Sequence, residues 1–289
     1  MQRKAHNNKE ILIKKPLKML VYIASILIIA ALAFLIIMYI FQDSLLFMTN
    51  KTSFKEHELL KAKYPFARDI TIETPDKTIL SGWFVKSSSE GKSPLLIHFD
   101  GNADLASDIL KHRECFEGWS ILSVNYRGYG LSQGKPSQTA LFSDALCIYD
   151  KYSRNQDIDN RNIVVMGYSL GTAVATHVAC NRHVKAVILT APFDSVTRIV
   201  QDKLPFLPVS RLVNHPLDSL SCAPLINAPL YTILAERDLL IPRKNSMNLI
   251  KAWKGVSKTE IIPKKGHSSM LEDEQFWNCI KAYMKSLKT

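Results

Sequence analysis

One stretch near the N-terminus carries no charged side chain. Met19–Phe41 spans 23 residues, and its polar positions are Ser25 and the tyrosines near the two ends. A helix rises about 1.5 Å per residue, so this stretch is long enough to cross the roughly 30 Å hydrocarbon core of a bilayer. A helix on a soluble core would show a polar face, which this stretch lacks. We therefore predict a transmembrane helix over residues 19–41.

A cleaved signal peptide is the alternative interpretation of this stretch. Ala31-Leu32-Ala33 resembles the small-residue site at which such peptides are cut. Cleavage there would leave the strongly apolar Phe34–Phe41 at the start of the mature chain. The pattern therefore favours an uncleaved anchor.

The charges that flank the apolar stretch predict its orientation. Residues 1–18 contain six basic side chains and one acidic side chain, a balance of +5. Only Lys51 and Lys55 follow the stretch within about 15 residues. Short basic segments stay in the cytoplasm. We expect a cytoplasmic N-terminus and an extracytoplasmic catalytic domain; in a bacterium that domain would be periplasmic or extracellular.

Beyond residue 42, apolar and β-branched runs of strand length recur along the chain. An opening antiparallel pair is predicted at Ile70–Thr74 and Ile79–Val85, around the turn residues Pro75-Asp76. Further strands are predicted at Leu95–Phe99, Ser120–Asn125, Ile163–Met166, Ala186–Thr190, Leu230–Leu234 and Glu260–Ile262. Several of these are almost continuously hydrophobic, as parallel strands covered on both faces are.

Helical patterns lie between the predicted strands. Apolar residues recur at three- and four-residue spacing over Ala103–Phe116, Thr139–Tyr152, Leu170–Asn181, Arg243–Trp253 and Leu271–Leu287. Alternation of strands and helices predicts an α/β fold with a mostly parallel, doubly wound sheet. In such sheets ligands bind beyond the carboxyl ends of the strands.

Composition narrows the function classes. Apolar residues make up 47% and charged residues 22% of the 289 residues, which is typical of a globular body. Net charge is +11, but no motif interleaves basic and aromatic residues, so nucleic acid is not an expected partner. The five cysteines form no Cys-x-x-Cys pair, which disfavours zinc and thioredoxin-like chemistry. No metal or organic cofactor is implied.

We divide the chain into a basic tail (1–18), the transmembrane helix (19–41) and a catalytic domain (42–289).

A candidate nucleophile follows the predicted strand at Ile163–Met166. Gly167-Tyr168-Ser169-Leu170-Gly171 lies between that strand and a helix that begins near Thr172. This is a Gly-x-Ser-x-Gly motif in its strand–turn–helix setting, where a strained turn exposes the serine. The helix N-terminus favours the negative charge that develops there. The alternative, Ser169 as a simple helix N-cap, does not account for the flanking strand and small residues.

Serine needs a base, and the sequence supplies candidates in the chain order serine, acid, histidine. His267 follows Gly266 in a loop between the last strand and the last helix. Asp238 lies just beyond the strand Leu230–Leu234 and is the preferred acid. Asp194 and Glu236 remain alternatives for the acid. In this hypothesis His267 takes the proton of Ser169, and Asp238 orients the imidazole.

Attack on an acyl group also needs donors for the resulting oxyanion. The N–H of Leu170 is one candidate. The other is the N–H of Asn102, in the turn Asp100-Gly101-Asn102-Ala103 after the strand Leu95–Phe99.

These motifs together resemble those of the single-pass, membrane-anchored α/β-hydrolase-domain proteins, a branch that includes protein-depalmitoylating thioesterases. The similarity runs from Phe41 onward, through the juxtamembrane Phe41–Phe47, the loop Asn125–Ser132, the Gly167–Gly171 motif, Asp238 and Gly266-His267. It implies an eight-stranded α/β-hydrolase fold and a serine hydrolase (carboxylesterase, thioesterase or lipase-like) acting through an acyl-serine intermediate. One position departs from the family, whose oxyanion loop has His-Gly-Asn-Ala. Asp100 replaces that histidine. Its carboxylate either comes close enough to His267 to raise the basicity of the imidazole, or faces away and holds the loop.

The segment Ser195–Asn227 is the one stretch long enough to form a lid. Its Leu204-Pro205-Phe206-Leu207-Pro208 either lines an acyl pocket or packs on the sheet. We expect an acyl-ester or thioester substrate, with lipids and lipidated molecules among the candidates, and the bilayer as a partner through residues 19–41. A serine peptidase with the same triad and a catalytically silent membrane-bound scaffold remain alternatives.

Overall fold

The computed structural model describes residues 2–88 and 91–288. The chain forms two compact units, Met1–Leu45 and Leu46–Thr289. The first contains helix α1 (Gln2–Leu46) except for its last residue. Within α1, Lys18–Leu46 covers 29 residues with a mean hydropathy of 3.0, which is long and apolar enough to span a membrane. This stretch is longer at both ends than the predicted 19–41.

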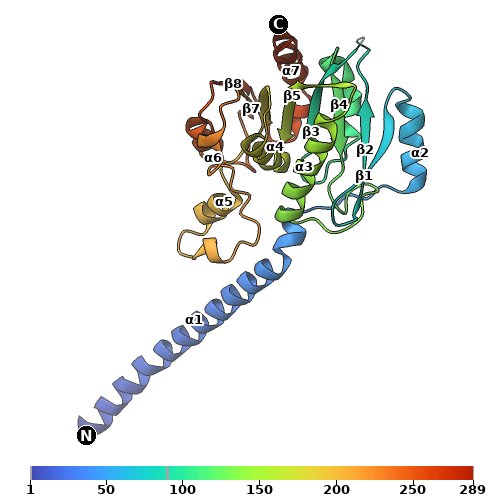
Figure 1. Cartoon of the computed structure of the whole chain (residues 1–289). Helices are drawn as coiled ribbons and strands as arrows, with labels where there is room; N and C mark the ends of the chain where they lie inside the picture. Colours follow the sequence, from blue (N-terminus) through green and yellow to red (C-terminus); the bar gives the residue numbers. More distant parts are fainter. Residues whose placement is uncertain (1, 89–90, 289) are drawn as a thin grey trace. The chain divides into compact units, whose positions relative to one another are not determined.

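The second unit is built around one eight-stranded sheet (Figure 1). In chain order its strands are β1 (Arg68–Glu73), β2 (Ile79–Val85), β3 (Ser93–Phe99), β4 (Ser120–Val124), β5 (Ile158–Tyr168), β6 (Ala186–Thr190), β7 (Leu230–Ala235) and β8 (Ser257–Ile262). In space they run β1-β2-β4-β3-β5-β6-β7-β8. Strand β2 pairs antiparallel with β1 and β4, and all other neighbours are parallel. The predicted mostly parallel eight-stranded sheet of the α/β-hydrolase fold is confirmed.

Two apolar cores lie on the two faces of this sheet. The pleat sends Leu95 and Ile97 of β3 into one core and Leu96 into the other. The first core is closed by α3 (Gln138–Ser153), α4 (Leu170–Asn181) and α6 (Arg243–Ala252), of which α3 and α4 lie in front of the sheet in Figure 1. The second is closed by the 3₁₀ helix η1 (Asp108–Phe116) and by α7 (Glu274–Ser286).

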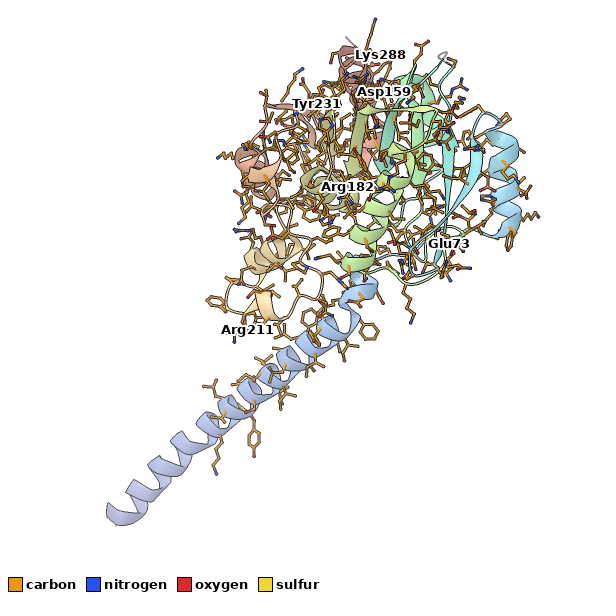
Figure 2. The ribbon with its side chains drawn as sticks, viewed as in Figure 1. Glu73, Asp159, Arg182, Arg211, Tyr231 and Lys288 are labelled. Carbon is orange, nitrogen blue, oxygen red and sulfur yellow. The ribbon has the colours of Figure 1, made fainter. Side chains whose placement is uncertain are left out.

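The loops that carry the candidate site lie at the carboxyl edge of the parallel strands. Figure 2 shows Asp159, at the start of β5, and Arg211 at opposite ends of this unit. Arg211 belongs to the segment between β6 and β7, which holds α5 (Val196–Lys203) and the short turns η2 (Val209–Arg211) and η3 (Ala223–Leu225). This segment therefore lies on the side where strand β5 ends, as the lid prediction requires.

Two local predictions need correction, and one helix was missed. Ala103–Phe116 is not one helix, because Ala103 has a φ of 71° and regular winding starts only at Asp108, as the 3₁₀ helix η1. The predicted helix Leu271–Leu287 is not continuous. Its first residues belong to the short 3₁₀ helix η4 (Ser269–Glu272), and Asp273 then caps the start of α7. Helix α2 (Phe54–Lys63) was not predicted. A capping box starts it, in which Ser53 and Glu56 satisfy each other's backbone N–H groups.

Candidate functional site

Ser169 occupies a strained turn between β5 and α4. Its φ of 49° and ψ of −114° lie outside the regions that L-residues prefer, and its N–H donates to Thr190 O at 2.9 Å. The turn exists because two glycines allow close backbone approach. A Cβ on Gly171 would lie 2.0 Å from Phe99 O, and one on Gly167 would lie 2.3 Å from Gly171 O. The helix α4 (Leu170–Asn181) has the bounds that its apolar pattern predicted.

The structure brings Ser169, His267 and Asp238 into one chain of hydrogen-bonding contacts. His267 Nε2 lies 2.9 Å from Ser169 Oγ, and His267 Nδ1 lies 2.7 Å from Asp238 Oδ2. The serine comes from the end of β5, the aspartate from the loop after β7 and the histidine from the loop after β8. Three residues that are far apart along the sequence thus meet at the carboxyl edge of the sheet.

The second carboxylate oxygen of Asp238 is held by the backbone. Oδ1 accepts hydrogen bonds from the N–H of Leu240 at 2.9 Å and of Ile241 at 2.8 Å. Burial raises the pKa of Asp238, but the hydrogen bonds from His267, Ile241 and Leu240 outweigh burial and bring the pKa below its ordinary value. The carboxylate stays ionised at neutral pH. An ionised partner at Nδ1 keeps the proton on that nitrogen and leaves Nε2 as an acceptor for the serine proton.

Tyr168 supports the histidine and was not identified from the sequence. Its ring lies 5.3 Å from the His267 ring between centroids, and its hydroxyl donates to His267 O at 3.2 Å. Tyr168 is the variable residue before the nucleophile in the Gly-x-Ser-x-Gly motif. An aromatic residue at that position was the only available signal, and it does not specify which loop the ring contacts.

The predicted oxyanion loop follows β3. Asn102 Oδ1 accepts hydrogen bonds from the N–H of Met48 at 2.7 Å and from the Tyr129 hydroxyl at 3.0 Å. Within the described residues the N–H of Asn102 donates no hydrogen bond to another backbone group. The N–H of Leu170 lies in the first turn of α4, where backbone donors have no partner inside the helix.

Asp100 faces away from His267 and holds its own loop. Its side chain is 4% exposed, and Oδ2 accepts from Ser123 Oγ of β4 at 2.8 Å. Oδ1 lies 3.2 Å from His98 Nδ1. These contacts fit a carboxylate that holds the oxyanion loop in place rather than one that raises the basicity of His267.

The two alternative acids are engaged elsewhere. Asp194 is buried and accepts hydrogen bonds from Asn245 and Asn248, both on α6. Glu236 accepts from the N–H of Lys264. Neither makes a hydrogen bond to His267 in the part of the chain that the structure describes.

The lid segment leaves large apolar side chains in solvent. Phe206 is 97% exposed, and Leu204 and Leu212 are exposed as well. Phe206 therefore neither packs on the sheet nor lines a closed pocket. Among the described residues, no three His, Cys, Asp or Glu side chains lie close enough together to hold a metal ion.

Sequence comparisons relate this chain to known hydrolases. The family model for the alpha/beta hydrolase fold matches residues 98–210. The Arabidopsis thaliana alpha/beta hydrolase domain-containing protein WAV2 is 34% identical over 137 residues, 44% of this chain and 43% of that protein. The zebrafish lysophosphatidylserine lipase ABHD12 is 32% identical over 124 residues, 39% of this chain and 31% of that protein. The chain thus spans less than half the length of these curated relatives.

Solved structures share the fold at lower identity. The ferulic acid complex of Est1E from Butyrivibrio proteoclasticus gives a TM-score of 0.64 at 18% identity and covers 75% of this chain and 98% of that one. Acetyl xylan esterase 1 from Thermoanaerobacterium gives a TM-score of 0.61 at 16% identity and covers 83% of this chain and 96% of that one. Similarity at this level supports the fold alone.

Proposed function

Because this chain belongs to the α/β-hydrolase superfamily, we propose that it is a serine hydrolase that cleaves an acyl ester or thioester through an acyl-serine intermediate. The observation that carries the proposal is the contact chain from Asp238 Oδ2 through His267 to Ser169 Oγ, at 2.7 and 2.9 Å. Structural N-caps and core histidines do not require such a chain, whereas an activated serine does.

The reaction then proceeds in two halves. Ser169 Oγ attacks the acyl carbon while its proton passes to His267 Nε2, and the N–H groups of Leu170 and Asn102 receive the oxyanion. The imidazolium returns that proton to the leaving alcohol or thiol, which departs and leaves the acyl group on Ser169. A water molecule attacks next, gives its proton to His267, and the acid is released as Ser169 regains a proton.

Lipid-like acyl groups are the substrate class that the surroundings of the site support. One relative carries the name of a lysophosphatidylserine lipase. The exposed Phe206 on the lid segment is suited to contact with an acyl chain rather than with water. Tethering by α1 at a bilayer would raise the local concentration of such substrates. We therefore propose lipid esters or thioesters, with lipidated proteins among them.

Fluorophosphonate labelling tests the nucleophile. We expect the full chain in detergent to be labelled, Ser169→Ala to lose all labelling, and Ser210→Ala, a change of an exposed lid serine, to keep it. Hydrolysis of a short p-nitrophenyl ester should fall by roughly 10⁶-fold in Ser169→Ala, as in other triad hydrolases. Equal labelling of Ser169→Ala and the parent chain would reject the assignment. A well-folded parent chain that is neither labelled nor active would favour the silent scaffold.

A further inference from the structure

A short segment of the second unit lies against the candidate oxyanion loop. This linker segment (residues 47–52) begins at the residue after α1 ends. The backbone N–H of Met48 donates to Asn102 Oδ1 at 2.7 Å, and Asn50 Nδ2 donates to Ala103 O at 3.2 Å. The turn that carries the Asn102 N–H is therefore bound to a part of the chain that lies 54 and 53 positions earlier in the sequence.

The linker segment is in turn fixed to Gly130. The N–H of Gly130 donates to Asn50 O at 2.7 Å, and the N–H of Thr52 donates to Gly130 O at 3.2 Å. Gly130 has a φ of 53°, and a Cβ added to it would lie 2.5 Å from Asn125 Nδ2, so this position requires glycine. Backbone hydrogen bonds therefore set the place of Asn50 beside the oxyanion loop.

Tyr129, the residue before Gly130, supplies a second donor to Asn102. Its side chain is buried, and its hydroxyl donates to Asn102 Oδ1 at 3.0 Å. Burial raises the pKa of this hydroxyl well above its ordinary value, so it keeps its proton and remains a donor. Because two donors are directed at Oδ1, the side chain of Asn102 is held in one orientation.

The turn that carries Asn102 needs such support because its backbone is strained. Ala103 has a φ of 71°, in the left-handed region that residues with a Cβ seldom adopt. Strained backbone persists only where the surrounding contacts hold it. Within the described residues the N–H of Asn102 donates to no other backbone group, so the contacts that hold this part of the turn act on the Asn102 side chain and on Ala103 O.

We propose that Tyr129 and Asn50 are positioning residues for the oxyanion step. They hold the turn so that the Asn102 N–H is directed at the acyl oxygen, on which negative charge develops when Ser169 attacks. The inference rests on the proposed serine hydrolase and extends it to two residues outside the triad. A misdirected N–H weakens the transition state more than the bound substrate, so loss of either residue should lower kcat and change KM little.

Hydrolysis of a short p-nitrophenyl ester by the full-length protein in a maltoside detergent tests the two roles. Tyr129→Phe removes only a hydroxyl, and Asn50→Ala removes the amide of an exposed side chain. Because complete loss of one oxyanion donor costs roughly 10²–10³-fold in kcat, we expect each change to lower kcat about tenfold and to keep KM within about threefold. Asn50 lies at the surface, so Asn50→Ala stays informative if Tyr129→Phe folds poorly.

Two matched variants are the controls for these changes. Tyr149→Phe removes the hydroxyl of another buried tyrosine, which donates to His183 O. Asn181→Ala removes another exposed amide, which donates to His177 O at 2.8 Å. Asn181 is the last residue of α4, at the end opposite Ser169. Neither control contacts the oxyanion turn, so both should keep kcat within about twofold of the parent.

Inhibition by an alkyl trifluoromethyl ketone separates positioning from a general loss of structure. Ser169 Oγ bonds to the ketone carbon, its proton passes to His267, and the carbonyl oxygen becomes an oxyanion. The inhibition constant should rise in Tyr129→Phe and Asn50→Ala by the same factor by which kcat falls, while KM for the ester stays nearly constant.

The outcomes distinguish this inference from the proposed function. A parent chain that is labelled by fluorophosphonate, with variants whose kcat matches that of the two controls, would overturn the positioning roles alone. So would a fall in kcat with unchanged inhibition by the ketone. A folded parent chain that is neither labelled nor active would reject the serine hydrolase itself, and the positioning roles with it.

Discussion

The charge of Asp238 can be tested by a substitution that keeps the size of its side chain. Asparagine preserves the size of the side chain but removes the charge that keeps the His267 proton on Nδ1. We expect Asp238→Asn to lower kcat by about 10⁴-fold on a p-nitrophenyl ester, as the equivalent change does in other Ser–His–Asp hydrolases. Fluorophosphonate labelling should slow in parallel, and thermal unfolding should confirm that the variant is folded.

The other two candidate acids provide the comparison. Glu236→Gln keeps an acceptor for the N–H of Lys264 and should leave kcat within about twofold. Asp194→Asn alters a buried hydrogen-bond network with α6, so it should lower the melting temperature while the remaining folded enzyme keeps the kcat of the parent. A collapse of kcat in Asp194→Asn with an unchanged Asp238→Asn would assign the orienting role to Asp194.

At the residue scale, some residues of the candidate site could be predicted from the sequence and others could not. Ser169, Asp238 and His267 could be singled out because each follows a strand, and parallel strands end at a common edge. The position of Asp100 against Ser123, and of Tyr168 against His267, could not be predicted. Those contacts depend on side-chain rotamers and loop paths between elements that are distant in sequence.

At the scale of elements, Arg127 joins the β1–β2 turn to α3. Its guanidinium makes paired hydrogen bonds to Asp144 on α3 at 2.7 and 2.8 Å and to Asp76 at 2.6 and 3.1 Å. Asp144 is only 5% exposed, so removal of Arg127 would leave a buried carboxylate unpaired. We expect Arg127→Leu to cost about 3–5 kcal/mol of stability. The melting temperature should fall by roughly 6–20 °C.

A second ion pair of similar geometry is the control for Arg127. Arg182 bonds to Asp150 at 2.6 and 2.8 Å, but both side chains are about one-third exposed, at 32% and 34%. Water would solvate the partner that remains, so Arg182→Leu should cost no more than about 1 kcal/mol. The double change Arg127→Leu with Asp144→Leu should recover part of the loss. Equal shifts for Arg127→Leu and Arg182→Leu would contradict the role assigned to burial.

The elements themselves were predictable to different degrees. Strands that are apolar on both faces, such as β6, were identified with their full bounds because burial imposes a continuous run. Strand β5 was predicted five residues too short at its start, since the polar residues Asp159–Asn162 give no strand pattern. Helix α2 has charged residues on most sides and no clear apolar stripe, so its capping box was the only local signal for it.

At the scale of the whole molecule, the predicted membrane helix raises the question of which side of the membrane would hold the second unit. The two apolar cores of the second unit do not indicate on which side of a membrane it lies. Orientation is instead encoded in the flanks of α1. Six basic side chains precede the apolar stretch, and two follow within about 15 residues. Each charge that must cross a bilayer is costly, so the more basic flank stays in the cytoplasm.

We therefore expect the catalytic unit to be extracytoplasmic and firmly anchored. The full chain, produced in a bacterial inner membrane, should resist alkaline extraction, and protease added outside spheroplasts should degrade its catalytic unit. Replacing Arg3, Lys4, Lys9, Lys14, Lys15 and Lys18 with glutamine removes the charge bias without shortening the apolar stretch. That variant should show mixed orientation, with part of the catalytic unit protected. A chain that is released by alkali would contradict the anchor, and full protection of the unmodified chain would reverse the predicted orientation.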